Sequence, residues 1–180
     1  RGELLDEAEA LRTEILARGL HPDGGHFVAA YDETRVDAAL LTLPLYGLVD
    51  ARDPRMVETV RHIRNELGRG SFLYRYRYDD GLPGDEGAFV LCGFWLAEVL
   101  AMMGRVDEAQ AVFVDHINAS NHVGLLAEEL DPGTRGQLGN FPQAFSHLGL
   151  INAAMRIDLA LRLRDEGSRD TPHLVRARRA

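Results

Sequence analysis

Two adjacent carboxylates, Glu128 and Glu129, are the residues of this chain best suited to chemistry. They follow a short apolar run over 124–127 and precede a loop over 131–141 that is broken by glycine and proline. Carboxylates that end an apolar run and face a long loop are placed for acid/base catalysis. The structural alternative is a solvated helix N-terminus with acidic residues nearby. Pro142 is predicted to open the next helix, where its missing N–H costs nothing.

A second candidate is the segment Tyr74–Asp80, which alternates aromatic and charged residues. Alternation predicts a strand with two different faces. One face could bind a sugar, because aromatic rings pack on the C–H surface of a pyranose while Arg and Asp take its hydroxyls. The alternatives are an amphipathic edge strand without a ligand, or a platform on which nucleobases stack. The acidic pair Asp85 and Glu86 follows a turn. Stabilisation of a helix N-terminus by its dipole is enough to explain these two residues, without a binding role.

Composition narrows the function classes. With 180 residues, of which 46% are hydrophobic, the chain can bury a sizeable core, and one domain is expected. A net charge of −8 disfavours nucleic acid and anionic membranes as partners. No apolar run reaches transmembrane length and no signal peptide is visible. The single cysteine, Cys92, excludes an intrachain disulfide and is consistent with a reducing, cytoplasmic compartment.

Nothing in the sequence indicates a metal or a cofactor. The seven histidines form no H-x-x-x-H or similar close pair, so we expect no metal site. A Gly-rich phosphate loop and a G-x-S-x-G nucleophile motif are both missing. Cys92 lies in an apolar stretch without an adjacent histidine or basic residue, which indicates a core position. We therefore expect chemistry by side chains alone.

The elements that must position these residues are six predicted helices of two alternating kinds. Three outer helices, each with a single apolar stripe, are predicted over 3–18, 54–67 and 106–118. Three inner helices, apolar on nearly every side, are predicted over 35–48, 86–103 and 142–164. Strict alternation predicts two concentric helical layers, an α/α toroid, whereas a plain bundle would show six similar helices.

The connections between these helices place the candidate site. The links from outer to inner helices are long, over 19–34, 68–85 and 119–141, and in a toroid they emerge on one face. Long ordered loops are usually functional, so this face is the candidate site. We expect one domain over 1–164 and a charged tail over 165–180. The chain starts without Met in a helical pattern, and we expect it to be part of a longer protein.

Two long segments resemble glycoside hydrolase family 15, which includes glucoamylases, related α-glucosidases and actinobacterial trehalases. They read DGLPGDEGAFVLCGFWLAEVLA and NHVGLLAEELDPGTRGQLGNFPQAFSHLGLINAA. The resemblance covers about residues 2–160 and corresponds to the C-terminal half of the catalytic domain. It implies an all-α fold, about half of an (α/α)6 toroid, in agreement with the alternation of helices.

The family inverts anomeric configuration with two carboxylic acids, one that protonates the glycosidic oxygen and one that activates water on the opposite face. The resemblance implies that Glu128 is the general base, and that Glu129, which stands where other branches have Gln, binds substrate. It also implies that Arg75 binds sugar hydroxyls and that Asp79 or Asp80 lies near another binding position.

Further substrate-binding residues implied by the resemblance are Tyr76, Glu86 and His147. The family's general acid lies in the N-terminal half, so this chain should encode half an active site and be inactive alone. Expected partners are an α-glucoside or α-glucan substrate, the missing N-terminal half and, because half a ring has open edges, a second copy. Trehalose and α-glucan stay open as substrates, and the arginine-rich segment could hold a phosphate. A non-catalytic helical-repeat domain that binds carbohydrate or protein is the alternative function.

Overall fold

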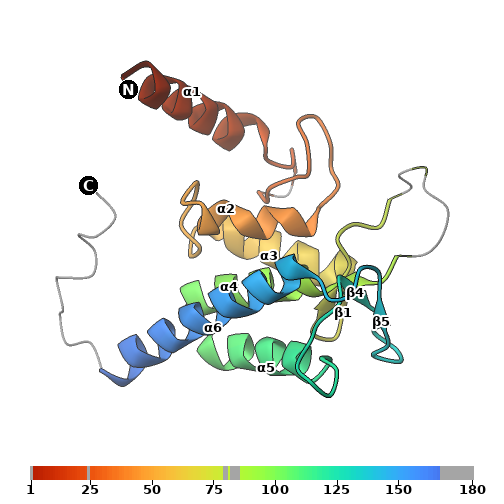
Figure 1. Ribbon diagram of the computed structural model, residues 1–180. Coiled ribbons are helices and arrows are strands. Elements are labelled where there is room, and N and C mark those ends of the chain that lie inside the picture. Colours follow the sequence, from red (N-terminus) through yellow and green to blue (C-terminus); the bar gives the residue numbers. More distant parts are fainter. Residues whose placement is uncertain (1, 24, 79–80, 82–85, 167–180) are drawn as a thin grey trace.

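A computed structural model describes residues 2–23, 25–78, 81 and 86–166 (Figure 1). Within them lie six α-helices: α1 (Gly2–Arg18), α2 (Thr42–Leu45), α3 (Pro54–Leu67), α4 (Val90–Met102), α5 (Val106–Ile117) and α6 (Ala144–Asp165). A 3-10 turn, η1 (Ala38–Leu41), leads into α2. The strands are two residues each: β1 (Gly68–Arg69), β2 (Phe72–Leu73), β3 (Ala88–Phe89), β4 (Glu129–Leu130) and β5 (Gln137–Leu138). The all-α prediction is confirmed. None of the described helices is long and apolar enough to span a membrane.

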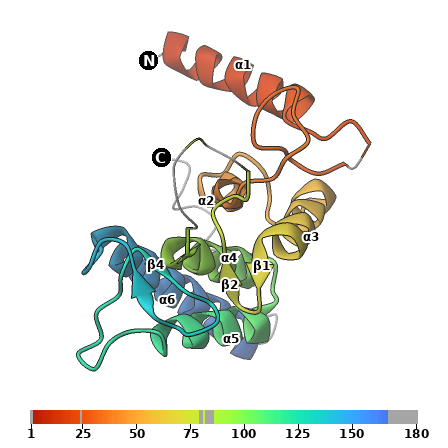
Figure 2. The ribbon, with the colours of Figure 1, turned by 90° about the vertical axis from the view of Figure 1, so that its right-hand side faces the viewer.

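The helix α4 is the centre of the core. Ten of its thirteen residues are buried, among them Phe94 and Leu100, because the sequence offers no polar face to solvent. It packs against α5, α6, η1 and β2, and Figures 1 and 2 show α5 and α6 beside it. The helix α3 instead buries a single stripe that includes Met56, Val60 and Ile63. The predicted contrast between an inner and an outer helix is confirmed for this pair.

Local signals fix where α3 begins. Asp53 is its N-cap, and the carboxylate accepts the N–H of Arg55 at 2.9 Å. Pro54 occupies the first helical position, where no hydrogen bond is lost. At the other end Gly68 leaves the helix in an extended conformation and starts the β1–β2 hairpin. The hairpin leads the chain to Arg75, one of the predicted site residues.

Two predicted helix starts are wrong because the backbone is hydrogen-bonded elsewhere. The stretch 86–103 begins extended, since Ala88 and Phe89 pair with β4, and the helix starts only at Val90. Pro142 does not open α6. Gln143 has an extended backbone, with φ −104° and ψ 120°, and its N–H donates to the carbonyl of Leu126 at 2.9 Å, so the helix begins at Ala144.

Two other expectations also need correction. The predicted inner helix over 35–48 is regular only over 38–45, as η1 followed by α2. The predicted strand over 74–80 is not a strand within residues 74–78, and residues 79–80 lie outside the described part. The hairpin extends as far as the Tyr74 N–H, which donates to the Leu67 carbonyl at 3.0 Å. Beyond it the Arg75 carbonyl bonds to the helical turn η1 rather than to a strand.

Both edges of the helical assembly expose apolar surface. The helix α1 has no buried residue, stands apart from α4, α5 and α6 in Figures 1 and 2, and leaves Leu4, Leu5 and Leu11 exposed. The helix α6 buries one side only, against α4 and α5. Along its other side runs an exposed apolar stripe: Phe145, Leu148, Ile151, Met155, Leu159 and Leu163. An inner helix of a complete toroid is covered on both sides. In this chain the surface of α6 that faces away from α4 has no neighbour among the described residues, as the open edges of half a ring predict.

Candidate active site

The backbone of Glu128 lies where three distant segments meet. Its carbonyl accepts the N–H of Val90 at 3.0 Å, which satisfies a donor that the first turn of α4 would otherwise leave unpaired. Its own N–H donates to the carbonyl of Asn140, also at 3.0 Å. The next residues form β4, the middle strand of the antiparallel sheet β3–β4–β5. Glu128 is thus fixed at the N-terminal end of the most buried helix.

The carboxylate of Glu128 is held through one oxygen. Its Oε2 accepts the side-chain Nδ2–H of Asn140 at 2.8 Å and the backbone N–H of the same residue at 3.1 Å. Gly139 makes this possible, because it has a φ of 71° and a Cβ there would lie 3.0 Å from Oε2. None of the described residues hydrogen-bonds Oε1. As far as the described residues go, Oε1 is therefore left for a proton or a water.

The neighbouring Glu129 has a different environment. Successive strand residues point to opposite faces, and its Oε2 accepts the N–H of Gly87 at 2.7 Å. Burial raises the pKa of this carboxyl, the Gly87 N–H partly offsets the rise, and the nearby charges of Glu86 and Glu128 add to it. The carboxylate of Glu129 is therefore hydrogen-bonded to the residue before β3, whereas the side chain of Glu128 faces the 139–140 turn.

Arg75 is anchored by a residue that the sequence analysis missed. Its Nε donates to Oδ1 of Asp37 at 2.8 Å, and its carbonyl accepts the N–H of Ala38 at 2.9 Å. The same Asp37 oxygen caps η1 by accepting the N–H of Ala39 at 2.6 Å. An aspartate directly before an apolar run is a helix N-cap signal, so the sequence did carry a mark of this position. That the same oxygen also holds the Arg75 guanidinium follows only from the fold.

Cys92 lies behind this pair and confirms its predicted core position. It is buried in α4, and desolvation raises the pKa of its thiol to about 12, while the charge of Arg75 opposes the rise and that of Asp37 adds to it. A thiol held in its protonated form is neither a nucleophile nor a metal ligand. The Arg75 carbonyl accepts the N–H of Ala38 in η1, which packs against α4, and the Glu128 carbonyl accepts the N–H of Val90 in the first turn of the same helix.

The structure does not bring the remaining predicted site residues together at one place. Tyr76 is half-buried and stacks on Tyr78, with ring centroids 4.4 Å apart. Glu86 is exposed. Asp79 and Asp80 lie outside the described residues. The described part therefore shows one aromatic stack beside Arg75, and it does not show how the acidic residues that follow are arranged.

His147 holds the segment that leads to Glu128. Its Nε2 accepts the N–H of Leu126 at 3.3 Å, and its Nδ1 lies 2.7 Å from the carbonyl of Gln143, which assigns the proton to Nδ1. Ser146 adds a second tie, since its hydroxyl donates to the carbonyl of Ala127 at 2.7 Å. Both bonds come from the first turn of α6. They fix the two residues that precede Glu128.

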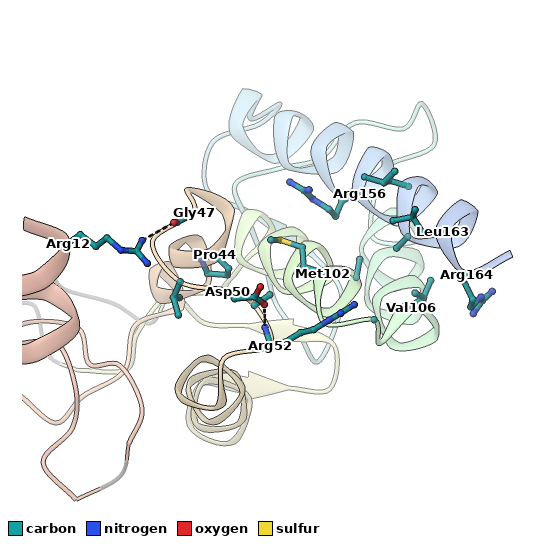
Figure 3. A pocket seen from close by; sticks show the side chains of 16 residues that line it. Arg12, Pro44, Gly47, Asp50, Arg52, Met102, Val106, Arg156, Leu163 and Arg164 are labelled. Carbon is teal, nitrogen blue, oxygen red and sulfur yellow. Dashed lines mark hydrogen bonds between the residues drawn. The ribbon is translucent and has the colours of Figure 1, made fainter. Parts of the chain in front are cut away.

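A cavity of about 730 Å³ lies away from these carboxylates (Figure 3). Its walls come from the segment 47–52 that follows α2, from the C-terminal ends of α4 and α6, from the start of α5 and from Arg12 of α1. Arg52, Arg156 and Arg164 also line it, while Arg12 donates to the carbonyl of Gly47 at 3.2 Å. Glu128 sits at the opposite, N-terminal end of α4. The cavity is therefore separate from the candidate active site. In the described part of the chain no three His, Cys, Asp or Glu side chains form a group that could hold a metal ion.

The family model described as "Glycosyl hydrolases family 15" matches residues 3–155. The chain belongs to this family. A trehalase of Thermoplasma acidophilum is 43% identical to it over 148 residues, which are 82% of this chain and 26% of that protein. A trehalase of Mycobacterium tuberculosis is 38% identical over 153 residues, 83% of this chain and 22% of that protein. The chain spans about a quarter of the length of these relatives.

Solved glycosidase structures share the fold of this family 15 chain. A wild-type glycosidase superposes with a TM-score of 0.75 at 23% identity, over 88% of this chain and 45% of that one. A variant of that glycosidase, solved in complex with glucose, superposes equally well. The chain covers less than half of the structure it matches, which agrees with the predicted half of an α/α toroid and with the two open edges.

Within the family 15 fold, the structure gathers Glu128, Glu129 and Arg75 around the N-terminal end of α4. It adds Asp37 and Asn140 as residues that hold them. Neither was found from the sequence, because each contacts a residue that is distant along the chain or separated by a turn of unknown shape.

Proposed function

We propose that this chain is the part of an inverting α-glucoside hydrolase that carries the general base, Glu128. The observation that supports this most is its carboxylate, which is fixed through Oε2 by Asn140 and has no described hydrogen-bond partner at Oε1. It lies in the long connection between α5 and α6, at the N-terminal end of the buried helix α4. Membership of glycosyl hydrolases family 15 supports the same assignment.

The chemistry needs two carboxyl groups on opposite faces of the sugar. Oε1 of Glu128 would take a proton from a water molecule as that water forms a bond to the anomeric carbon. At the same time the glycosidic C–O bond breaks, and an acid on the other side protonates the leaving oxygen. Inverting enzymes hold the two groups roughly 6.5–9.5 Å apart, which leaves room for the water. Glu129 is too near in sequence to be the second group, so the acid comes from the rest of the catalytic domain.

Trehalose is the substrate that we propose first. The relatives of Thermoplasma acidophilum and Mycobacterium tuberculosis are both trehalases. Arg75 suits a sugar because Asp37 holds its Nε, and a guanidinium donates along fixed directions that match hydroxyl or acetal oxygens. An α-glucan is the other substrate class that the same residues would accept. Assays with trehalose, maltose and starch distinguish the two.

The assignment of the base is tested in a protein that carries the whole catalytic domain. Glu128→Gln keeps the size and the hydrogen bond to Asn140 but removes the base, so kcat should fall about 10²–10⁴-fold or more with KM retained. Glu129→Gln is the matched control at the adjacent position and should retain far more activity, because its carboxylate is committed to the Gly87 N–H. A dead Glu129→Gln enzyme beside an active Glu128→Gln enzyme would overturn the assignment.

A further inference from the structure

We infer that Asn140 is a positioning residue that orients the base for its water, an inference that rests on the proposed role of Glu128. Asn140 is the residue whose side chain reaches the Glu128 carboxylate in the described part of the chain. It does so from a turn that comes twelve residues later. Nothing in the sequence motif alone distinguishes it from the other polar residues of that loop.

Two donors of one residue converge on a single carboxylate oxygen. The Nδ2–H and the backbone N–H of Asn140 reach Oε2 of Glu128 at 2.8 and 3.1 Å, and the Glu128 N–H returns a bond to the Asn140 carbonyl at 3.0 Å. The last torsion of a glutamate is otherwise broad, so a free carboxylate samples many orientations. Rotation about this torsion would break both bonds at once. The pair therefore selects one orientation of the carboxylate plane.

This orientation matters for proton transfer. With Oε2 occupied by two donors, Oε1 is the oxygen that can accept a proton, and its direction is set by the two bonds to Asn140. A base must lie within hydrogen-bond reach of the proton that it takes, and a misplacement of about 1 Å can cost on the order of 100-fold in rate. Because an amide is neutral, Asn140 fixes the carboxylate without adding a charge next to it.

The side chain of Asn140 has little structural work besides this contact. It is exposed, and the turns around it are closed by other groups: the Gln143 N–H bonds to the Leu126 carbonyl at 2.9 Å, and the Asp131 N–H bonds to the Gly136 carbonyl at 2.8 Å. The sharp turn before it depends on Gly139, whose φ is positive. Loss of the Asn140 amide should therefore change Glu128 more than it changes the fold.

The test uses the whole catalytic domain with the variants Asn140→Ala and Asn140→Asp. Asn140→Ala keeps the backbone bond and loses the side-chain bond, so kcat should fall about 10–100-fold with KM changed little. Asn140→Asp places a second carboxylate against Glu128, and like charges raise a carboxyl pKa. The acidic limb of the pH profile of kcat/KM, which reports the base of the free enzyme, should then move by about one unit or more toward higher pH.

Asn121→Ala is the matched control. Asn121 lies in the same long connection, and its Oδ1 accepts the N–H groups of Val123 and Leu125 at 3.0 and 2.9 Å, but it does not touch Glu128. This variant should lower the melting temperature and leave the acidic limb where it is in the wild type. A merely structural Asn140 would behave in the same way.

The outcomes separate the two proposals. If Glu128→Gln is inactive and the acidic limb of Asn140→Asp coincides with that of the wild type, the positioning role is refuted while the base stands. An unchanged kcat in Asn140→Ala refutes the positioning role as well, and needs no folded Asn140→Asp protein. If Glu128→Gln retains full activity, the proposed function itself fails.

Discussion

Acid should destabilise this fold through one buried imidazole, that of His116. The side chain is 1% exposed, its Nδ1 lies 2.7 Å from the carbonyl of Val112, and the rings of Phe72 and Phe94 pack at 4.9 and 5.4 Å. Gly93 of α4 gives it room, because any Cβ there would overlap the imidazole. Burial lowers the pKa of His116 from 6.5 to about 4. The Val112 carbonyl and the charge of Asp115 oppose this shift, and the charge of Arg135 adds to it.

The sign and size follow from proton linkage. Between about pH 6.5 and pH 4 the unfolded chain binds a proton at this histidine that the folded chain does not bind, so the free energy of unfolding falls as the pH falls. Each unit of pKa difference is worth about 1.4 kcal/mol, which makes the total loss on the order of 3 kcal/mol. Above pH 6.5 this contribution to stability is fully present. Such a loss is a large part of the roughly 5–15 kcal/mol that hold a typical domain together.

Urea unfolding followed by circular dichroism at several pH values between 7.5 and 4.5 measures this. We expect His116→Gln to be less stable at pH 7 but to have a shallower pH dependence, by roughly 1 kcal/mol per pH unit near pH 5. His122→Gln, at an exposed loop position, is the control and should keep the wild-type slope. Parallel curves for wild type and His116→Gln would refute the reasoning, because protonation of other groups would then explain the whole effect.

Three further predictions concern packing, association and activity. Gly149→Ala should destabilise the fold by about 1–3 kcal/mol in the same unfolding assay, because the new methyl would lie 2.7 Å from a methyl carbon of Leu91 and 3.2 Å from the Cβ of Phe94. The 180-residue chain should self-associate through the exposed apolar stripe of α6, and Met155→Glu should shift it toward monomer in sedimentation at micromolar concentration; a stable wild-type monomer would contradict this. The same chain alone should hydrolyse neither trehalose nor maltose nor starch, and turnover at a normal enzyme rate would contradict that expectation.

The helical framework could be predicted because burial leaves a periodic mark in the sequence. The sequence of α3 has a single apolar stripe and that of α4 is apolar on nearly every side, and the structure places them as an outer and a central helix. The start of α4 could not be predicted from periodicity. Residues 86–89 run directly into the apolar stretch of α4, but Ala88 and Phe89 find strand partners in β4, which lies some forty residues later. Non-local pairing of this kind has no local signature.

The site was predictable only as far as single residues. Glu128 stood out through its neighbours and its resemblance to a family motif, and Arg75 through the alternation around it. The partners that hold them, Asn140 and Asp37, depend on how two turns fold back. The exposed side of α6 was expected only through the resemblance, because half of a toroid has open edges. Periodicity alone shows which face is apolar but not whether anything in the same chain covers it.

The loop that joins β4 to β5 can change in length without displacing Glu128. The strands are closed at their ends by the Asp131 N–H, which donates to the Gly136 carbonyl at 2.8 Å, and the turn is tightened by the Asp131 carboxylate on the Gly133 N–H at 2.7 Å. Glu128 lies beyond the other end of the hairpin, tied to α4 and to Asn140. Residues inserted between 132 and 135 would thus lengthen a loop without changing the strand register, at an entropic cost that grows only with the logarithm of length. Natural insertions or a grafted binding peptide can therefore be accommodated a few residues from the Glu128 carboxylate, because α4 and Asn140 hold that residue in position.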